Sequence, residues 1–263
     1  IYDSASEIAS EVIASTNVDG DRIGVSLEKG KVSVPRGYKE AYAAYVSGGW
    51  PTLSCNPEFG GQGLPSLVSM PVYEMVMAAN FSWSHLVLLT NSVVRAVETH
   101  ADPSLKDLFL KKLIAGEYSG TMVLTEPQAG SDLSALTTSA VPNGDHYKIT
   151  GQKIFITWGE HDLSENIIHM VLARLPDAPE GVKGISLFLV PKYLVNDDSS
   201  LGERNSLEAV SIEHKLGIHG CATCVMNFED ATGYLVGKSI KVFCVCLRLW
   251  TIEGLGWPVK GWP

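Results

Sequence analysis

The segment from Met122 to Asp132 combines residue types that could bind a ligand. A strand pattern ends at Thr125, and the small residues Ala129 and Gly130 follow, so a ligand could approach the backbone closely. Ser131 adds a hydroxyl. These features suit a ligand with a planar polar edge and a phosphate. An ordinary strand-to-loop connection has the same pattern, so both interpretations stay open on the pattern alone.

Other segments resemble binding motifs less well. Gly60-Gly61-Gln62-Gly63 lacks the spacing of a dinucleotide loop and follows no strand pattern, which predicts a turn. Cys221 and Cys224 have the spacing of half a zinc site, but the next close pair, Cys244 and Cys246, lies in an apolar run with the wrong spacing. No histidine stands in a recognisable nucleophile motif. We therefore expect no metal site and no Ser-His or Cys-His catalysis.

The elements that must position the 122–132 segment fall into two groups. Residues up to about Gly120 are predicted to be helical, with apolar stripes at Val68–Ala79, Leu86–Val97 and Leu105–Leu113. Asp102 and Pro103 predict the start of the third helix, which ends near Gly116.

Strand patterns replace the helical ones after Gly120, and Asn143-Gly144-Asp145 predicts a hairpin turn. Such closely spaced strands predict an antiparallel barrel or sandwich. The expected fold is therefore α+β, with a helical bundle followed by a β-barrel or sandwich domain. The predicted strands are Met122–Thr125, Leu136–Val141, His146–Thr150, Lys153–Thr157, Ile167–Arg174, Ile185–Val190 and Cys224–Glu229.

Composition excludes several partner classes. The 263 residues are 45% hydrophobic, which suits a globular protein, and carry a net charge of −9. That charge argues against nucleic-acid and anionic-membrane partners. No apolar run approaches the roughly 20 residues of a membrane span. Five cysteines without a signal pattern suggest reduced thiols, so we expect a soluble, cytoplasmic protein. The start at Ile1 leads us to expect a piece of a longer chain.

Residues 238–263 differ in character from the rest. Residues 239–263 carry a net charge of +2, against −11 for the first 238, and they hold three of the six tryptophans. Frequent Gly and Pro argue against a helix near the end. We expect a frameshift or splicing change near Gly237, which transcript sequencing would test.

Together, the motifs resemble the acyl-CoA dehydrogenase family. Residues 122–132 are similar to its T-E-P-x-A-G-S-D motif, residues 151–157 to its second flavin strand, and residues 56–63 to its P-E-x-G-G-x-G. The resemblance covers roughly residues 37–237. It implies an N-terminal helical domain at 1–118, a flavin-binding middle domain at 119–237 and a tail, 238–263, without a match in the family.

Four further segments resemble the branch of the family that contains methylmercaptopropionyl-CoA dehydrogenase. They are residues 159–163, 172–176, 183–188 and 215–220. The resemblance to this branch implies a possible methylthiopropanoyl-CoA substrate.

The resemblance also implies roles for individual residues. Met122, Leu124 and Thr125 would lie along the flavin edge of FAD, and Ser131 would contact both the pyrophosphate region and the acyl-CoA. On the second strand, Phe155 would stack on the flavin, with Ile156 beside it, and Thr157 would hydrogen-bond near the hydride-accepting nitrogen. The family often has Trp where Phe155 stands, and either aromatic keeps the stacking surface. Met122 replaces a commoner Tyr, so no side-chain hydroxyl role is expected there.

The family's mechanism requires a Glu that removes the α-proton of the acyl-CoA thioester. That Glu belongs to a C-terminal helical domain with no match here, and neither Glu126 nor Glu253 is assigned as the base. We therefore expect this chain to hold the cofactor half of the site and to be inactive alone. The resemblance further implies acyl-CoA as substrate, electron-transfer flavoprotein as partner and a homo-oligomer at full length.

Three alternatives remain open. An acyl-CoA oxidase of the same superfamily would form peroxide under air. A DNA-associated relative would bind DNA in a salt-dependent way, although the acidic charge argues against it. The third is an inactive fragment that binds little or nothing.

Overall fold

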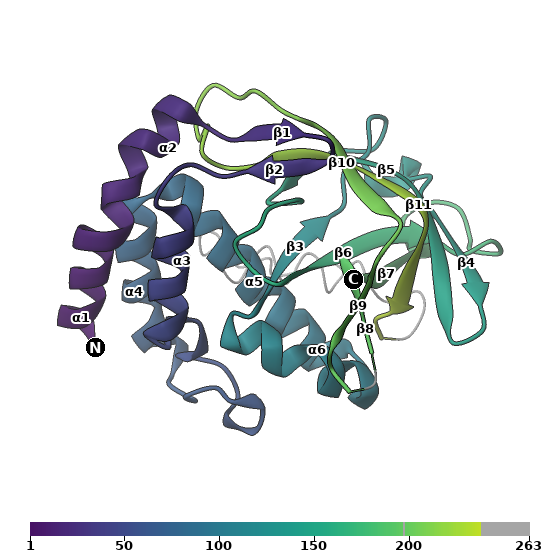
Figure 1. The fold of residues 1–263 in the computed structure, drawn as a ribbon. Helices are drawn as coiled ribbons and strands as arrows, with labels where there is room; N and C mark the ends of the chain where they lie inside the picture. The colour runs from purple at the N-terminus through teal and green to yellow at the C-terminus, as the bar shows by residue number, and fades with distance from the viewer. Residues whose placement is uncertain (197, 238–263) are drawn as a thin grey trace.

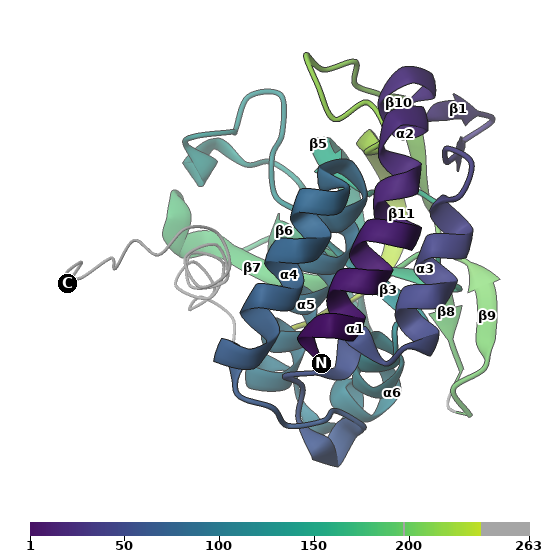
Figure 2. The same ribbon diagram turned by 90° about the vertical axis from the view of Figure 1, so that its left-hand side faces the viewer.

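Helices occupy one side of the molecule and strands the other (Figure 1). The structure, a computed structural model, describes residues 1–196 and 198–237. At the N-terminus, α1 (Tyr2–Glu7) continues through a π-helical segment (Ile8–Ile13) and a short 3₁₀ turn into α2 (Asn17–Ile23). This rod packs beside α3 (Tyr38–Ser47) and α4 (Ser66–Ala79), as Figure 2 shows. The tail predicted at 238–263 lies outside the described residues.

The three predicted helices are confirmed. Helix α4 and α5 (Phe81–His100) contain the first two apolar stripes, and α6 (Pro103–Ala115) contains the third. Helix α6 begins at the predicted proline and ends before Gly116, whose φ of 77° is the left-handed conformation that suits glycine. Asp102 occupies the N-cap position, but its side chain makes no capping hydrogen bond. Asp102 and Pro103 were both predicted to mark the start of this helix, but only Pro103 acts there as expected.

The prediction of helix up to residue 120 is wrong at residues 26–33. There, β1 (Ser26–Glu28) and β2 (Lys31–Ser33) form an antiparallel hairpin that lies next to β10 (Figure 1). Lys29 and Gly30 form its turn, both with positive φ (49° and 72°), as two-residue hairpins require. The helical expectation failed because two-residue turn chemistry outweighs helix propensity over so short a segment.

Five strands close into a ring that forms the predicted barrel. Strand β6 pairs with β7, β7 with β11, β11 with β5 and β5 with β4, and a single bridge between Ser139 and Arg174 joins β4 back to β6. Strand β3 extends the sheet on β6, and β10 extends it on β11. A separate pair, β8 and β9, lies beside the barrel. The bounds are β3 Tyr118–Val123, β4 Ser139–Asn143, β5 His146–Thr157, β6 Asn166–Arg174, β7 Ile185–Pro191, β8 Tyr193–Val195, β9 Leu201–Arg204, β10 Leu207–Ile212 and β11 Thr223–Leu235.

Two details of the strand prediction are corrected by the structure. The sheet is mixed and not antiparallel throughout, because β3 pairs with β6 in parallel. The two strands predicted at 146–150 and 153–157 are one strand, β5, that runs through Gly151. A Cβ at Gly151 would lie 2.5 Å from Thr138 Oγ1, so glycine permits a close approach there and does not end the strand.

Helix α5 contacts the barrel through β3 at a glycine. A Cβ placed on Gly120 would lie 2.5 Å from Val93 Cβ, and the Gly120 amide donates a 3.0 Å hydrogen bond to Thr90 Oγ1. From the other side, Trp158 Nε1 donates to the Ser82 carbonyl across 3.1 Å. These contacts fix the helical side against the two strands that end near the candidate site.

We predict that Gly120→Ala destabilises the protein by about 1–3 kcal/mol, because the added methyl group overpacks a contact that has no room for it. Urea unfolding would measure the loss. Gly217→Ala is the matched control, since its Cβ would meet nothing within 4 Å. Equal stabilities of the two variants would contradict the close contact between α5 and β3.

Candidate functional site

The ends of β3 and β5 lie side by side, so the two sequence motifs form one surface. Thr121 Oγ1 donates to the Thr157 carbonyl across 2.5 Å, and the Ile154 amide donates to the Thr125 carbonyl across 2.9 Å. Residues about 30 positions apart in the chain therefore meet. The resemblance implied that both motifs contact one flavin, and the fold places their backbones side by side.

A buried ion pair joins these two segments, and sequence analysis did not identify it. Lys153 Nζ lies 2.8 Å from Glu126 Oε1 and donates to the Leu124 carbonyl across 3.0 Å. Both side chains are almost fully buried. Glu126 belongs to the first motif and Lys153 to the second. The presence of opposite charges in the two motifs was therefore the sequence signal that could have predicted this ion pair.

The Glu126 carboxylate is saturated with hydrogen bonds. Besides Lys153 it accepts from the Gln128 amide and from the backbone amides and hydroxyls of Thr137 and Thr138, at 2.5–3.0 Å. Burial by itself would raise its pKa, but the Lys153 charge and these donors outweigh burial and lower the pKa to about 2. Burial lowers the pKa of Lys153 to about 8, although Glu126 opposes this. Glu126 is thus a structural anion, with no free lone pair for proton transfer.

A β-bulge turns Phe155 outward. Opposite Cys224 and Met226 on β11, strand β5 contains one extra residue between Lys153 and Ile156. Phe155 has a φ of 59°, unusual for a bulky residue, and its side chain is 55% exposed. Bulges of this kind re-aim side chains and occur next to binding sites. The exposed ring offers a flat apolar surface to a ligand.

The remaining predicted residues differ in accessibility. Ile156 is 1% exposed, so its side chain belongs to the core and only its backbone could contact a ligand. Met122 and Leu124 are half-buried and pack against the core cluster of α5 and α6. The hydroxyls of Thr125 and Thr157 are half-buried and have no hydrogen-bond partner among the described residues. These free hydroxyls lie where the two motifs meet.

The tip of the first motif is open. Ser131 is exposed, and its hydroxyl has no partner in the described part of the chain. A Cβ on Gly130 would meet only Thr125 Cγ2, at 3.7 Å, which is ordinary contact. The protein itself therefore leaves room at both positions. The structure places Ser131 on the same loop as Thr125, and no hydrogen bond joins it to β5 in the described part of the chain.

The weaker motifs have structural roles. Gly60–Gly63 is a turn, as predicted, and the amides of Gly61 and Gly63 donate to the chain's own carbonyls. Burial raises the pKa of the Cys221 and Cys224 thiols to about 12, which disfavours the thiolate that zinc requires. The second cysteine pair lies outside the described residues. Within residues 1–196 and 198–237, no His, Cys, Asp and Glu side chains gather in a group that could hold a metal.

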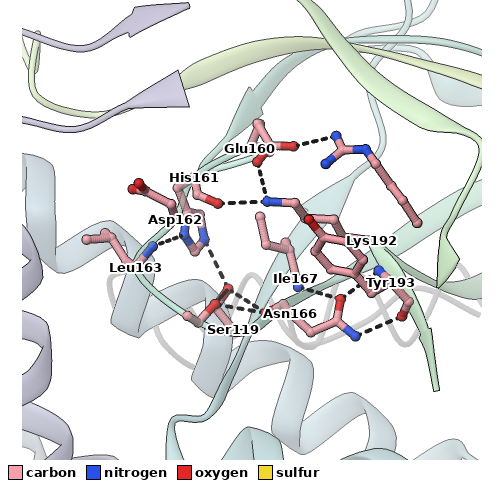
Figure 3. Close-up of polar contacts among 12 residues, drawn as sticks. Ser119, Glu160, His161, Asp162, Leu163, Asn166, Ile167, Lys192 and Tyr193 are labelled. Carbon is pink, nitrogen blue, oxygen red and sulfur yellow. Dashed lines mark hydrogen bonds and ion pairs between the residues drawn. The ribbon is translucent and has the colours of Figure 1, made fainter. Parts of the chain in front are cut away.

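One serine–histidine contact has the wrong chemistry for catalysis. His161 Nε2 lies 3.0 Å from Ser119 Oγ, and His161 Nδ1 accepts the Leu163 amide (Figure 3). Because Nδ1 is an acceptor, Nε2 carries the proton and cannot remove one from Ser119. Burial holds the pKa of His161 well below its ordinary value, so the ring is neutral. The pair is fully buried and therefore structural.

Comparison with known proteins decides the family. Residues 3–117 match the acyl-CoA dehydrogenase N-terminal domain, and residues 121–231 match the acyl-CoA dehydrogenase middle domain. The chain belongs to the acyl-CoA dehydrogenase family. Over 229 residues it is 52% identical to 3-methylmercaptopropionyl-CoA dehydrogenase of Ruegeria pomeroyi, covering 87% of this chain and 39% of that relative. The resemblance found in the sequence is thereby confirmed.

Two further members of the family match with lower sequence identity. A butyryl-CoA dehydrogenase of Syntrophomonas wolfei is 36% identical and is matched over 88% of this chain and 39% of its own length. The structure of butyryl-CoA dehydrogenase from Megasphaera elsdenii shares the fold, with a TM-score of 0.74 at 24% identity, covering 93% of this chain and 59% of that one. The chain thus spans about 39% of the length of these two curated relatives.

A further solved structure is described as the electron transferring flavoprotein of Acidaminococcus fermentans. Its TM-score is 0.76 at 25% identity, and the match covers 94% of this chain and 59% of that one.

Among the described residues of this chain, no helix combines the length and apolar character that crossing a membrane requires.

We predict that Glu126→Gln lowers the free energy of unfolding at pH 7 by about 3 kcal/mol, because it leaves Lys153 buried without its counter-charge. A folded-state pKa of about 2 against an ordinary 4.5 gives stability that is present above pH 4.5 and lost as the pH falls toward 2. The variant should lose that part of the acid dependence.

Urea unfolding between pH 2 and pH 7 would measure both effects. Asp107→Asn, which neutralises an exposed carboxylate of α6, is the control and should leave the curve nearly unchanged. If Glu126→Gln kept the wild-type pH dependence, the ion pair would not determine acid stability.

Proposed function

We propose that this chain provides the FAD-contacting surface of an acyl-CoA dehydrogenase. The observation that carries the proposal is the meeting of the β3 and β5 ends, which brings together segments that contain two hydroxyls without partners among the described residues and an exposed aromatic ring. Side chains or backbone groups of seven residues would form the contact: Met122, Leu124, Thr125, Ser131, Phe155, Ile156 and Thr157.

The described residues fit this cofactor chemically. Half-buried hydroxyls without partners at Thr125 and Thr157 suit the polar edge of a flavin, and Phe155 offers a stacking face. The open space at Gly130 suits close approach of a pyrophosphate. Bound FAD supplies the capacity to accept two electrons as hydride. The chain's own residues bind and orient it and exclude water from one side.

The proposed substrate is an acyl-CoA thioester of the methylmercaptopropionyl class, bound in part by Ser131. The 52% identity to the Ruegeria pomeroyi dehydrogenase supports this class. Glu126 is committed to Lys153, and we propose that the catalytic Glu belongs to the C-terminal helical domain that the family resemblance implies. Glu253 lies outside the described residues, and we assign it no role.

Further proposals concern the longer protein and its setting. We propose electron-transfer flavoprotein as the electron acceptor, a homo-oligomeric assembly at full length and a cytoplasmic location. The domains proposed are 1–118 and 119–237, so the proposed boundary falls just after the first residue of β3, Tyr118.

We predict that Thr157→Val weakens FAD binding about fivefold, because it removes one hydrogen bond worth about 1 kcal/mol and keeps the side-chain shape. Titration of FAD into the purified chain, followed by quenching of flavin fluorescence, would measure the dissociation constant. An unchanged constant would exclude a contact between the Thr157 hydroxyl and the flavin.

Gly130→Val should reduce FAD occupancy more strongly and leave the thermal unfolding midpoint almost unchanged. The branched side chain would fill the space proposed for the pyrophosphate, whereas the protein alone has room for it. Gly217→Val, also in open space, is the matched control. Normal FAD binding by Gly130→Val would show that the pyrophosphate binds elsewhere.

A further inference from the structure

The end of β5 continues into a segment held in an unfavourable backbone conformation. Trp158 has a φ of 54°, rare for a bulky residue, and its amide donates to the Ala222 carbonyl across 2.6 Å. Such strain persists only where surrounding contacts impose it. Since Thr157 precedes Trp158, the groups that impose it also fix the proposed FAD-binding hydroxyl.

A buried cluster of charged side chains contacts residues 160 and 161, which follow Trp158 closely in the chain (Figure 3). Glu160 is 2% exposed, and its carboxylate pairs with Lys192 Nζ on one oxygen and with Arg204 on the other, the latter across 3.1 Å. Lys192 Nζ also donates to the His161 carbonyl across 2.9 Å. The cations come from the β7–β8 connection and from β9, so distant parts of the chain converge on one short segment.

A histidine of β6 contacts the backbone of the same segment. His169, fully buried on β6, places Nε2 2.8 Å from the Gly159 carbonyl and Nδ1 3.1 Å from the Val190 carbonyl. The backbone is closely packed at Gly159, where an added Cβ would lie 3.0 Å from Ile156 Cγ2. Residues 158–161 are therefore fixed by contacts from β6, from the β7–β8 connection, from β9 and from the loop before β11.

We propose that Glu160, Lys192 and Arg204 are positioning residues for the FAD-contacting end of β5, acting through residues 158–161. The inference rests on the proposed FAD site. A surface ion pair could not do this, because exposed pairs contribute little and leave side chains free to move. The buried pair fixes geometry, since removing one partner leaves the other charge without compensation.

The test uses the 263-residue chain and the Lys192→Met variant. We expect the FAD dissociation constant to rise about tenfold and the visible spectrum of the bound flavin to change. Amide hydrogen exchange should quicken at residues 156–161 and stay unchanged in β4, which reports local opening. Lys192→Arg keeps the charge and should restore binding to within about threefold of wild type.

Lys39→Met is the matched control. Lys39 pairs with Asp162, adjacent to the same segment, across 2.6 Å, but both side chains are more than half exposed. This variant should change neither FAD binding nor exchange. If Lys192→Met fails to fold, Arg204→Met takes its place, because Arg204 is partly exposed; it should weaken FAD binding about threefold.

The outcomes separate this inference from the proposed function. If wild type binds FAD, and Lys192→Met binds it equally with unchanged exchange at 156–161, the positioning role is wrong and the FAD site stands. If wild type binds no FAD, the proposed function fails. Exchange at residues 156–161 then decides by itself whether the cluster holds the strand end.

Discussion

The buried ion pair between Glu126 and Lys153 is the constraint on which the proposed site depends. It connects the loop after β3 to the middle of β5, and Thr137 and Thr138 add four hydrogen bonds from the far end of that loop. Both ends of the loop are therefore fixed to one carboxylate. Between these two ends, the tip around Gly130 and Ser131 is exposed to solvent. A buried charge pair is a costly way to stabilise a fold, so its value here lies in geometry.

That geometry includes strain on β5. The bulge puts Phe155 in a left-handed conformation with an exposed ring, and Trp158 adopts a similar backbone conformation a few residues later. Two ion clusters bracket this stretch: Glu126 with Lys153 before it, and Glu160 with Lys192 and Arg204 after it. Hydrogen bonds from the Gly120 amide and from the Trp158 side chain attach β3 and the end of β5 to helix α5. The surface offered to a ligand is thus preorganised by groups that do not themselves form it.

The periodic spacing of apolar residues and the positions of proline and glycine predicted much of this fold. Helices α4, α5 and α6 follow from apolar stripes and from Pro103, and Gly144 marks the hairpin between β4 and β5. Short elements were missed, because β1, β2, β8 and β9 have three or four residues and too little pattern to detect. Parallel pairing of β3 with β6 is a long-range choice that local sequence does not encode.

The sequence predicted which residues belong to the candidate site better than it predicted how their side chains pack. Motif resemblance named the residues of both segments, but not that Ile156 points into the core, because the bulge shifts the alternation of β5 by one residue. The roles of Lys153, Lys192 and His169 depend on partners that lie 10 to 32 residues away in the chain, and no local pattern reveals such contacts. Charged side chains to which the sequence analysis gave no role therefore hold these segments together.

The central claim is that residues 122–131 and 155–157 together form the FAD surface. Nuclear magnetic resonance of the isotope-labelled chain, with FAD added stepwise, tests it most directly. The account predicts amide shifts confined to those two segments and their neighbours. Shifts that instead gather at the cleft lined by Lys29, Lys31 and Arg204, with none at Thr125 or Thr157, would contradict it.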